Sequence, residues 1–289
     1  MKSISFGSVL YALCLSMGCH HELVDELLLE PDPNTNTQLG MNGEWGARLW
    51  TGTLEGSGDI ELVVPEGIDA PIRGLFVFGQ GGAIQAQRYR WLSAHVASRG
   101  FVVLTPVGLF DWGAFLSGAD MYKAVQQLHL ADEPFDGLTL EDVPITYGGH
   151  SRGGVNAADA YAFSVNDGIE TSLVLLESYP NPAHDFSGLE GMVVAIAGSK
   201  DERVNVEKVE EGAAAFDESW MVTIDGMNHY QLTESPTESE LGNDGTPTID
   251  IETARYCTLV FVDALLETST TGDESWFHEP QSWPACVER

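Results

Sequence analysis

Basic residues are scarce in this chain of 289 residues. Lys and Arg together number 13 against 44 Asp and Glu, which gives a formal net charge of −31 at pH 7. A surface so poor in positive charge is repelled by the phosphates of nucleic acids and by anionic membrane surfaces. The composition therefore argues against nucleic acid as a partner. The negative charge favours solubility and names no substrate.

Cysteine is also scarce, with four residues and no Cys-x-x-Cys pair. The missing pair argues against a zinc or redox centre built on that motif. Cys14 and Cys19 belong to the N-terminal segment, which leaves Cys257 and Cys286 as an even pair. In an oxidising compartment this pair is predicted to form a disulfide that ties the C-terminal tail to the last helix. Two free thiols are the alternative.

The apolar stretch at the N-terminus is short. It runs from Ile4 to Met17 behind a single charge, Lys2. This length is too small for a stable membrane anchor and typical of the hydrophobic part of a secretory signal. Residues 1–18 are therefore predicted to be a signal peptide that is removed from the mature protein.

The end of this stretch, Leu15-Ser16-Met17-Gly18-Cys19, resembles a bacterial lipobox, although the leucine stands one place early. The resemblance implies lipidation of Cys19, with ordinary secretion or an uncleaved anchor as alternatives. The expected location is outside the cell or in the cell envelope of a bacterium. A lipid anchor would then be the only contact with the membrane.

Residues 19–41 contain Pro31-Asp32-Pro33 and a polar run, and are predicted to be a polar tether. Residues 42–289 are predicted to form a single catalytic domain. Within it, apolar strands alternate with helices, which favours an α/β fold with a mostly parallel central sheet covered by helices on both faces. The expected strands are 60–64, 74–78, 101–104, 143–147, 173–176, 192–196 and 220–224, and the expected helices are 89–98, 121–130, 155–163 and 251–266.

A glycine-rich turn connects one expected strand to the following helix. Residues 149–153 read Gly-His-Ser-Arg-Gly, between the strand at 143–147 and the helix at 155–163. Strand, G-x-S-x-G and helix in this order resemble the nucleophile elbow of α/β-hydrolases. Such a turn needs flanking residues without side chains, which Gly149 and Gly153 provide. The resemblance implies an α/β-hydrolase fold with Ser151 as its nucleophile.

A serine hydroxyl needs a base to remove its proton and an acid to orient that base. In this fold the chain order is Ser, then Asp or Glu, then His. His229 directly follows the last expected strand, where the base belongs, and Asp201 follows the preceding strand. The predicted triad is Ser151, His229 and Asp201, with Glu177 as the alternative acid.

Two backbone N–H groups are needed to stabilise the developing oxyanion. One is predicted to be the amide of Arg152, directly after the nucleophile. The other is expected in the loop Gly79-Gln80-Gly81-Gly82, whose glycines let the backbone approach a substrate closely. The amide of Gly82 is favoured and that of Gly81 is the alternative.

Further segments resemble a narrower group of enzymes. The elbow is similar to that of chlorophyllases, and residues 94–103 to a segment shared by chlorophyllases, bacterial cutinases and polyester hydrolases. The loop Gly226–Gln231 is similar to the histidine loop of related bacterial hydrolases. Gln80 and Gly82 depart from the His or Pro and the aromatic residue of those oxyanion loops. The shared implication is hydrolysis of a carboxylic ester.

The connection in which many hydrolases of this fold carry a lid is short in this chain. Only about fifteen residues, Glu177 to Gly191, separate two expected strands where many hydrolases of this fold insert one. No lid domain is therefore expected, and the cleft should admit bulky groups. The predicted function is a secreted serine hydrolase of small or polymeric esters that works through an acyl-enzyme without a cofactor. The alternatives are a serine peptidase or acyltransferase with the same triad, and a non-catalytic surface binding protein.

A weak calcium signal occurs in Gly242-Asn243-Asp244-Gly245 together with Asp250. Its spacing is not that of an EF-hand loop, so a solvated turn is expected there and no metal site is predicted.

Overall fold

The computed structural model describes residues 26–30, 38–54, 58–67, 70–108, 116–129, 140 and 142–287. The predicted signal peptide and the lipidation site Cys19 lie outside the described residues. Within the described ranges, no helix combines the length and the apolar character needed to cross a membrane.

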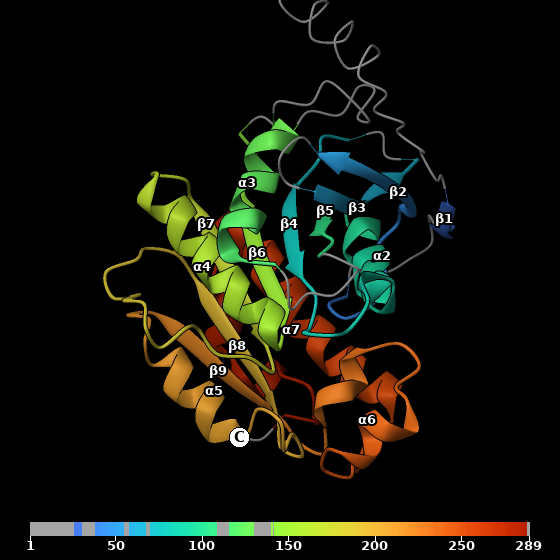
Figure 1. Ribbon diagram of the computed structural model, residues 1–289, viewed down its shortest axis with the longest axis vertical. Coiled ribbons are helices and arrows are strands. Elements are labelled where there is room, and N and C mark those ends of the chain that lie inside the picture. The colour runs from blue at the N-terminus through green and yellow to red at the C-terminus, as the bar shows by residue number, and fades with distance from the viewer. Residues whose placement is uncertain are drawn as a thin grey trace, which may run out of the picture.

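A nine-stranded sheet forms the centre of the fold, in the order β1-β2-β3-β5-β4-β6-β7-β8-β9 (Figure 1). The pairs β1/β2, β2/β3 and β3/β5 are antiparallel, and all pairs from β5 through β9 are parallel. The strands span Glu26–Leu29 (β1), Gly46–Leu54 (β2), Gly58–Glu66 (β3), Gly74–Gly79 (β4), Phe101–Pro106 (β5), Ile145–His150 (β6), Thr171–Leu176 (β7), Val193–Gly198 (β8) and Ser219–Ile224 (β9).

Helices cover both faces of the sheet, so its inner strands are buried on each side. Every residue of β4, β5, β6, β7 and β8 is buried, as expected for parallel strands with continuous apolar sequence. One core cluster joins a sheet face to α2 and α7, and the other joins the opposite face to α3, α4 and α5. The helices span Arg90–Ser98 (α2), Gly118–His129 (α3), Arg152–Asn166 (α4), Val206–Ala213 (α5), Glu238–Gly242 (α6) and Ile251–Thr271 (α7).

This architecture confirms the predicted mostly parallel sheet with helices on both faces. The N-terminal region differs from the prediction. Glu26–Leu29 lies within the expected tether but pairs with β2 as an edge strand, and the Gly40 amide donates to the buried Asp263 carboxylate at 2.6 Å. These parts of residues 19–41 are therefore built into the domain. Leu28, Leu29 and Leu39 pack against the core, which the polar residues around them do not indicate in the sequence.

The parallel strands bring the expected site residues to one edge of the sheet. Because β6, β7, β8 and β9 run in the same direction, the segments that follow them all leave from their carboxyl ends. Ser151, Glu177, Asp201 and His229 lie in these four segments. Between β7 and β8 the chain forms turns and bends without a helix or strand.

The predicted disulfide is confirmed. Cys257 in α7 is bonded to Cys286 in the tail, with their Cα atoms 6.6 Å apart. The tail also pairs with the end of β9, since Val287 forms a bridge to Ile224 and the Asp225 amide donates to the Cys286 carbonyl at 2.8 Å. The disulfide thus fixes the tail beside the strand that leads to His229.

Candidate active site

Ser151 occupies a strained turn between β6 and α4. Its φ of 53° and ψ of −123° are unfavourable for a residue with a side chain and are held by the surrounding structure. The Ser151 amide donates to the Leu176 carbonyl at 3.0 Å, and the Ser178 hydroxyl donates to the Ser151 carbonyl at 2.6 Å. These contacts anchor the turn to β7 and leave the Ser151 residue half-buried at the sheet edge.

Glycines on either side of Ser151 allow this turn. A Cβ atom on Gly153 would lie 2.0 Å from the Gly79 carbonyl oxygen, and one on Gly149 would lie 2.4 Å from the Gly153 carbonyl carbon. No side chain fits at either position without moving the backbone of the elbow or of the loop after β4. The expected need for glycine is confirmed at both positions.

The structure brings the predicted base and acid together. His229 Nδ1 lies 2.7 Å from Asp201 Oδ2, and both residues are 4% exposed. The other carboxylate oxygen of Asp201 accepts the amides of Arg203 and Val204, each at 2.7 Å. Asp201 is thus held by three donors, which fix the orientation of its carboxylate and, through it, that of the imidazole.

Glu177 lies close to the same imidazole in a different setting. Its Oε2 is 3.9 Å from His229 Nδ1, beyond hydrogen-bond distance. The residue is fully buried, and neither carboxyl oxygen has a hydrogen-bond partner among the described residues. Burial, with a smaller contribution from the negative charges of Asp201 and Asp244, raises the pKa of Glu177 well above its usual value. Glu177 is therefore suited to remain a neutral acid rather than to orient the base.

The loop after β4 presents two amides with different environments. The Gly81 amide donates to the Tyr89 hydroxyl at 3.2 Å, so it is already engaged. Within the described part of the chain, the Gly82 amide has no hydrogen-bond partner. The Arg152 amide is the first of α4, where no intrahelical acceptor is available. Among the described residues, the amides of Gly82 and Arg152 are thus free to donate to a substrate oxygen.

His150 connects the loop after β4 to the surroundings of His229. Its Nδ1 lies 2.7 Å from the Tyr89 hydroxyl, which accepts the Gly81 amide on its other side. Burial raises the pKa of Tyr89 and, with the neighbouring His229 charge, lowers that of His150. The neutral arrangement has Tyr89 donating to His150 Nδ1, which places the imidazole proton on Nε2, 3.4 Å from Glu177 Oε2.

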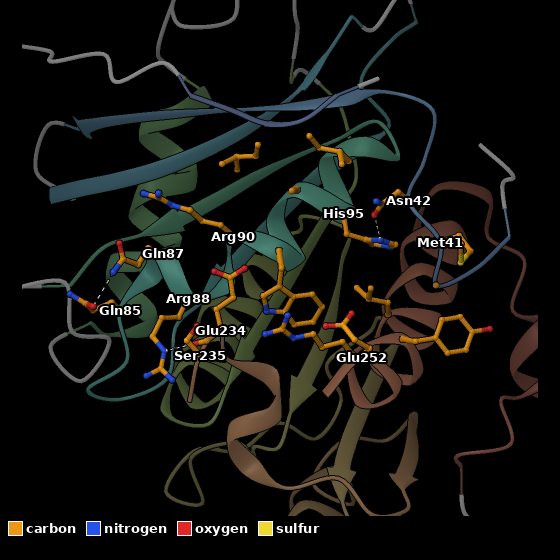
Figure 2. A pocket seen from close by; sticks show the side chains of 18 of the residues that line it. Met41, Asn42, Gln85, Gln87, Arg88, Arg90, His95, Glu234, Ser235 and Glu252 are labelled. Atoms are coloured by element: carbon orange, nitrogen blue, oxygen red, sulfur yellow. Dashed lines mark hydrogen bonds between the residues drawn. The ribbon is translucent and has the colours of Figure 1, made fainter. Parts of the chain in front are cut away.

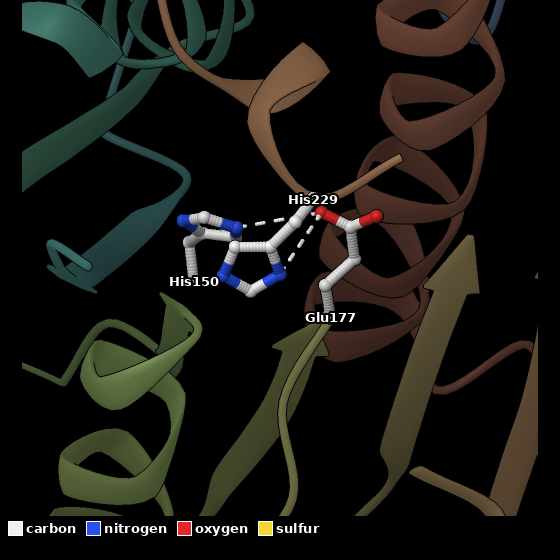
Figure 3. Close-up of side chains that lie close together, drawn as sticks. All are labelled: His150, Glu177 and His229. Atoms are coloured by element: carbon white, nitrogen blue, oxygen red, sulfur yellow. Dashed lines mark ion pairs between the residues drawn. The ribbon is translucent and has the colours of Figure 1, made fainter. Parts of the chain in front are cut away.

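His150, Glu177 and His229 form a buried cluster whose donor atoms lie within 4.8 Å of one another (Figure 3). Two imidazoles and a carboxylate are ligand types that zinc takes. His229 Nδ1, however, is hydrogen-bonded to Asp201. A metal ion at this place would have to displace that bond. The cluster is better described as the packing around the His229 ring, since the His150 and His229 ring centroids are 4.4 Å apart.

A cavity of about 1050 Å³ lies elsewhere, against α2 and α7 (Figure 2). Ser151, Asp201 and His229 do not line it. Arg88 in its wall is bound by Glu240 at 2.7 Å, and Arg90 is bound by Glu61 at 2.6 Å. These two arginines of the cavity wall are thus paired with carboxylates from α6 and β3.

Sequence reasoning missed part of this site. Chain order does not favour His150 as the base, because it precedes the nucleophile, and Tyr89 belongs to no motif. Tyr89 follows β4 and His150 ends β6, and the two side chains meet because these strands are paired in the sheet. The only indication in the sequence is that His150, a polar residue, stands between Gly149 and Ser151 of the elbow.

Asp244 lies in a largely exposed turn, as expected, but its own carboxylate is half-buried and bonded to the protein. Its Oδ2 accepts the His229 amide at 2.7 Å and its Oδ1 accepts the Glu202 amide at 2.8 Å. Asp250, the other residue of the weak calcium signal, accepts the Thr253 amide at the start of α7 at 2.7 Å. Both carboxylates are thus engaged by backbone amides.

Comparison with known proteins agrees with this geometry. Among curated proteins, none matches the chain at a significant level. A family model described as the alpha/beta hydrolase family matches residues 75–238, more than half of the chain. The matched region runs from β4 through the elbow and the segments that carry Asp201 and His229, and ends in α6. The chain belongs to the alpha/beta hydrolase family and is a hydrolase.

Proposed function

We propose that this hydrolase cleaves carboxylic esters with Ser151 as nucleophile, His229 as base and Asp201 as the acid that orients the base. The main observation in support is the buried contact of 2.7 Å between His229 Nδ1 and Asp201 Oδ2. This contact lies at the sheet edge where Ser151 occupies a strained turn. The His229 ring packs 4.4 Å from that of His150, which directly precedes Ser151. This proximity supports assigning the pair to the elbow serine.

In the proposed mechanism, Ser151 Oγ attacks the ester carbonyl carbon while His229 Nε2 accepts the hydroxyl proton. Asp201 stabilises the imidazolium that forms. The carbonyl oxygen becomes an oxyanion, which accepts hydrogen bonds from the amides of Gly82 and Arg152. When the tetrahedral intermediate collapses, the C–O bond to the alcohol breaks and His229 returns the proton to the leaving alkoxide.

The acyl-enzyme is then hydrolysed by the reverse path. His229 removes a proton from water as the oxygen attacks the acyl carbon, and it returns this proton to Ser151 Oγ when the second tetrahedral intermediate releases the carboxylic acid. Burial raises the pKa of Glu177 and lowers that of His150, which favours the neutral form of each beside the imidazolium. This limits the negative charge that must be stabilised in a buried place.

Short and medium soluble esters are the proposed substrates. The connection between β7 and β8 is short and contains no helix, which supports a cleft open without a lid. An open cleft buries little of a long acyl chain, and each CH₂ contributes about 0.8 kcal/mol only when buried. Catalytic efficiency should therefore peak at short to medium chains. A rate that rises only above the solubility limit of a long-chain ester would contradict this.

A fluorophosphonate probe tests the nucleophile directly. We expect it to label the wild-type protein and Ser151→Ala to lose both labelling and hydrolysis of p-nitrophenyl esters. Ser187→Ala removes an exposed loop serine and is the matched control, which should keep both. Equal labelling of Ser151→Ala and wild type would reject the triad. Transfer of the acyl group to added amines or alcohols in preference to water would instead indicate an acyltransferase.

We also propose that the protein is exported and anchored through Cys19. The disulfide between Cys257 and Cys286 supports an oxidising compartment. In a bacterial host, a palmitate analogue should label the wild-type chain and not Cys19→Ala. Labelling of both, or of neither, would reject the anchor.

A further inference from the structure

One loop outside the proposed triad contacts the neighbourhoods of both the acid and the base. After the His229 segment the chain passes through α6 and returns to the sheet edge before α7 begins. Asp244 lies at this return. It accepts the Glu202 amide with one carboxylate oxygen at 2.8 Å and the His229 amide with the other at 2.7 Å. Glu202 directly follows Asp201, so one carboxylate joins the two loops.

Contacts with neighbouring segments fix the backbone of the loop around Asp244. The Asn228 side-chain amide donates to the Gly245 carbonyl at 2.9 Å. A Cβ atom on Gly245 would lie 2.1 Å from the Lys200 carbonyl oxygen, so the loop backbone packs directly on the acid loop. The Thr248 amide donates to the Gly226 carbonyl at 2.9 Å. The loop therefore packs against the segment that carries Asp201 and against the segment that carries His229.

We propose that Asp244 is a positioning residue that sets the geometry between Asp201 and His229. The proposal rests on the proposed triad. The Lys200 amide also joins these two loops, donating to the Met227 carbonyl at 2.8 Å, and the Asp244 carboxylate adds two amide contacts directly beside Asp201 and at His229 itself. A shift of about 1 Å in a catalytic group can lower a rate by about 10²-fold.

Asp250 provides a comparison within the same loop. Its carboxylate also accepts a backbone amide, that of Thr253 at 2.7 Å, but this contact only begins α7. Asp244 and Asp250 are thus the same residue type, six positions apart, with the same kind of contact. Only Asp244 contacts residues next to or within the acid–base pair.

The first test is the kinetics of Asp244→Ala and Asp244→Asn on a soluble ester, measured well below each melting temperature. Asp244→Ala should lower kcat by up to about 10²-fold with KM nearly unchanged. Asp244→Asn keeps the volume and one acceptor oxygen, and should lose less. The control Asp250→Ala should melt at a lower temperature but keep its kcat. Equal kcat values for Asp244→Ala and Asp250→Ala, or a loss in KM alone, would overturn the proposal.

Proton NMR gives a second readout that needs no turnover. The Nδ1 proton that His229 shares with Asp201 should resonate far downfield in the wild type. It should move or broaden in Asp244→Asn and stay in place in Asp250→Ala. An unchanged resonance in Asp244→Asn would overturn the positioning role even if Asp244→Ala fails to fold.

Double substitution separates this proposal from the function on which it rests. If Asp244 acts through Asp201, replacing Asp244 by Ala should lower activity little further in an Asp201→Asn background. Full additivity of the two losses would overturn the proposal. Retained esterase activity in Ser151→Ala would reject the proposed function. An inactive Ser151→Ala beside a fully active Asp244→Ala would reject the positioning role alone.

Discussion

Two His–Asp pairs of similar length are buried at different places in the described part of the fold. His229 Nδ1 lies 2.7 Å from Asp201 at the carboxyl edge of the sheet. His95 Nε2 lies 2.9 Å from Asp263 between α2 and α7. Side-chain exposure is 5% or less for all four residues. Distance and burial alone therefore do not distinguish the two pairs.

Their neighbours do distinguish them. Asp263 also accepts the Gly40 amide at 2.6 Å and lies 3.3 Å from the buried Arg99 guanidinium, so its contacts join the N-terminal segment to α2 and α7. Asp201 and His229 instead follow strands parallel to the one that ends at the strained Ser151. A buried His–Asp pair thus becomes a candidate catalytic pair only beside an activatable nucleophile.

Of the substitutions that test the difference between the two His–Asp pairs, Asp201→Asn should have the largest effect. The amide cannot stabilise the imidazolium and favours the wrong tautomer, so kcat should fall by about 10⁴-fold with little change in melting temperature. Steady-state hydrolysis of a p-nitrophenyl ester measures this. If Asp201→Asn stays active while Glu177→Gln does not, the acid follows β7 instead of β8.

Asp263→Ala should give the opposite result. It leaves the buried Arg99 and His95 without the fully buried Asp263 carboxylate, and breaking such a pair costs about 3–5 kcal/mol of unfolding free energy. The kcat of the folded fraction should not change. Urea unfolding measures the loss, and Glu267→Ala is the control, because the Glu267 side chain is 34% exposed and should contribute less. A selective loss of kcat in Asp263→Ala would mean that the second pair also serves the site.

The disulfide offers a third comparison, because α7 carries both Asp263 and Cys257. The bond closes a segment with a sequence separation of 29, for which loop entropy gives about 3–4 kcal/mol. Reduction should lower the melting temperature and leave kcat at 25 °C unchanged. The Cys257→Ala/Cys286→Ala double variant should not respond to reductant. Recovery of both cysteines as alkylated peptides from unreduced protein would contradict the bond.

Much of the fold could be predicted because its signals are local. Apolar runs such as Leu173–Leu176 identify buried strands, and the elbow glycines report a backbone contact that excludes side chains. Strand ends escaped prediction: β6 extends to His150, and α4 begins at Arg152, directly after Ser151. The tight turn allows both elements to reach the serine, which periodicity cannot show.

The supporting contacts of the site could not be predicted, because they join distant segments. Tyr89 meets His150 across 61 positions of sequence, and Glu202 meets Asp244 across 42. Neither pair has a motif, and Asp244 read alone resembles any polar turn residue. Chain order narrowed the choice to Asp201 or Glu177. The donors that hold Asp201, which Glu177 lacks, are visible only in three dimensions.

Glu177→Gln should have the smallest effect, and its pH dependence tests whether this third buried carboxyl is neutral. Because burial raises its pKa in the folded state, Glu177 contributes stability below its usual pKa near 4.5, which is lost as pH rises toward the folded value. Glutamine does not ionise, so the melting temperature of Glu177→Gln relative to wild type should be higher at pH 8 than at pH 4. Each unit of pKa shift corresponds to about 1.4 kcal/mol. Calorimetry at both pH values measures this difference, and kcat should remain near wild type. A variant that is relatively less stable at pH 8 would mean that Glu177 is ionised and held by donors as Asp201 is.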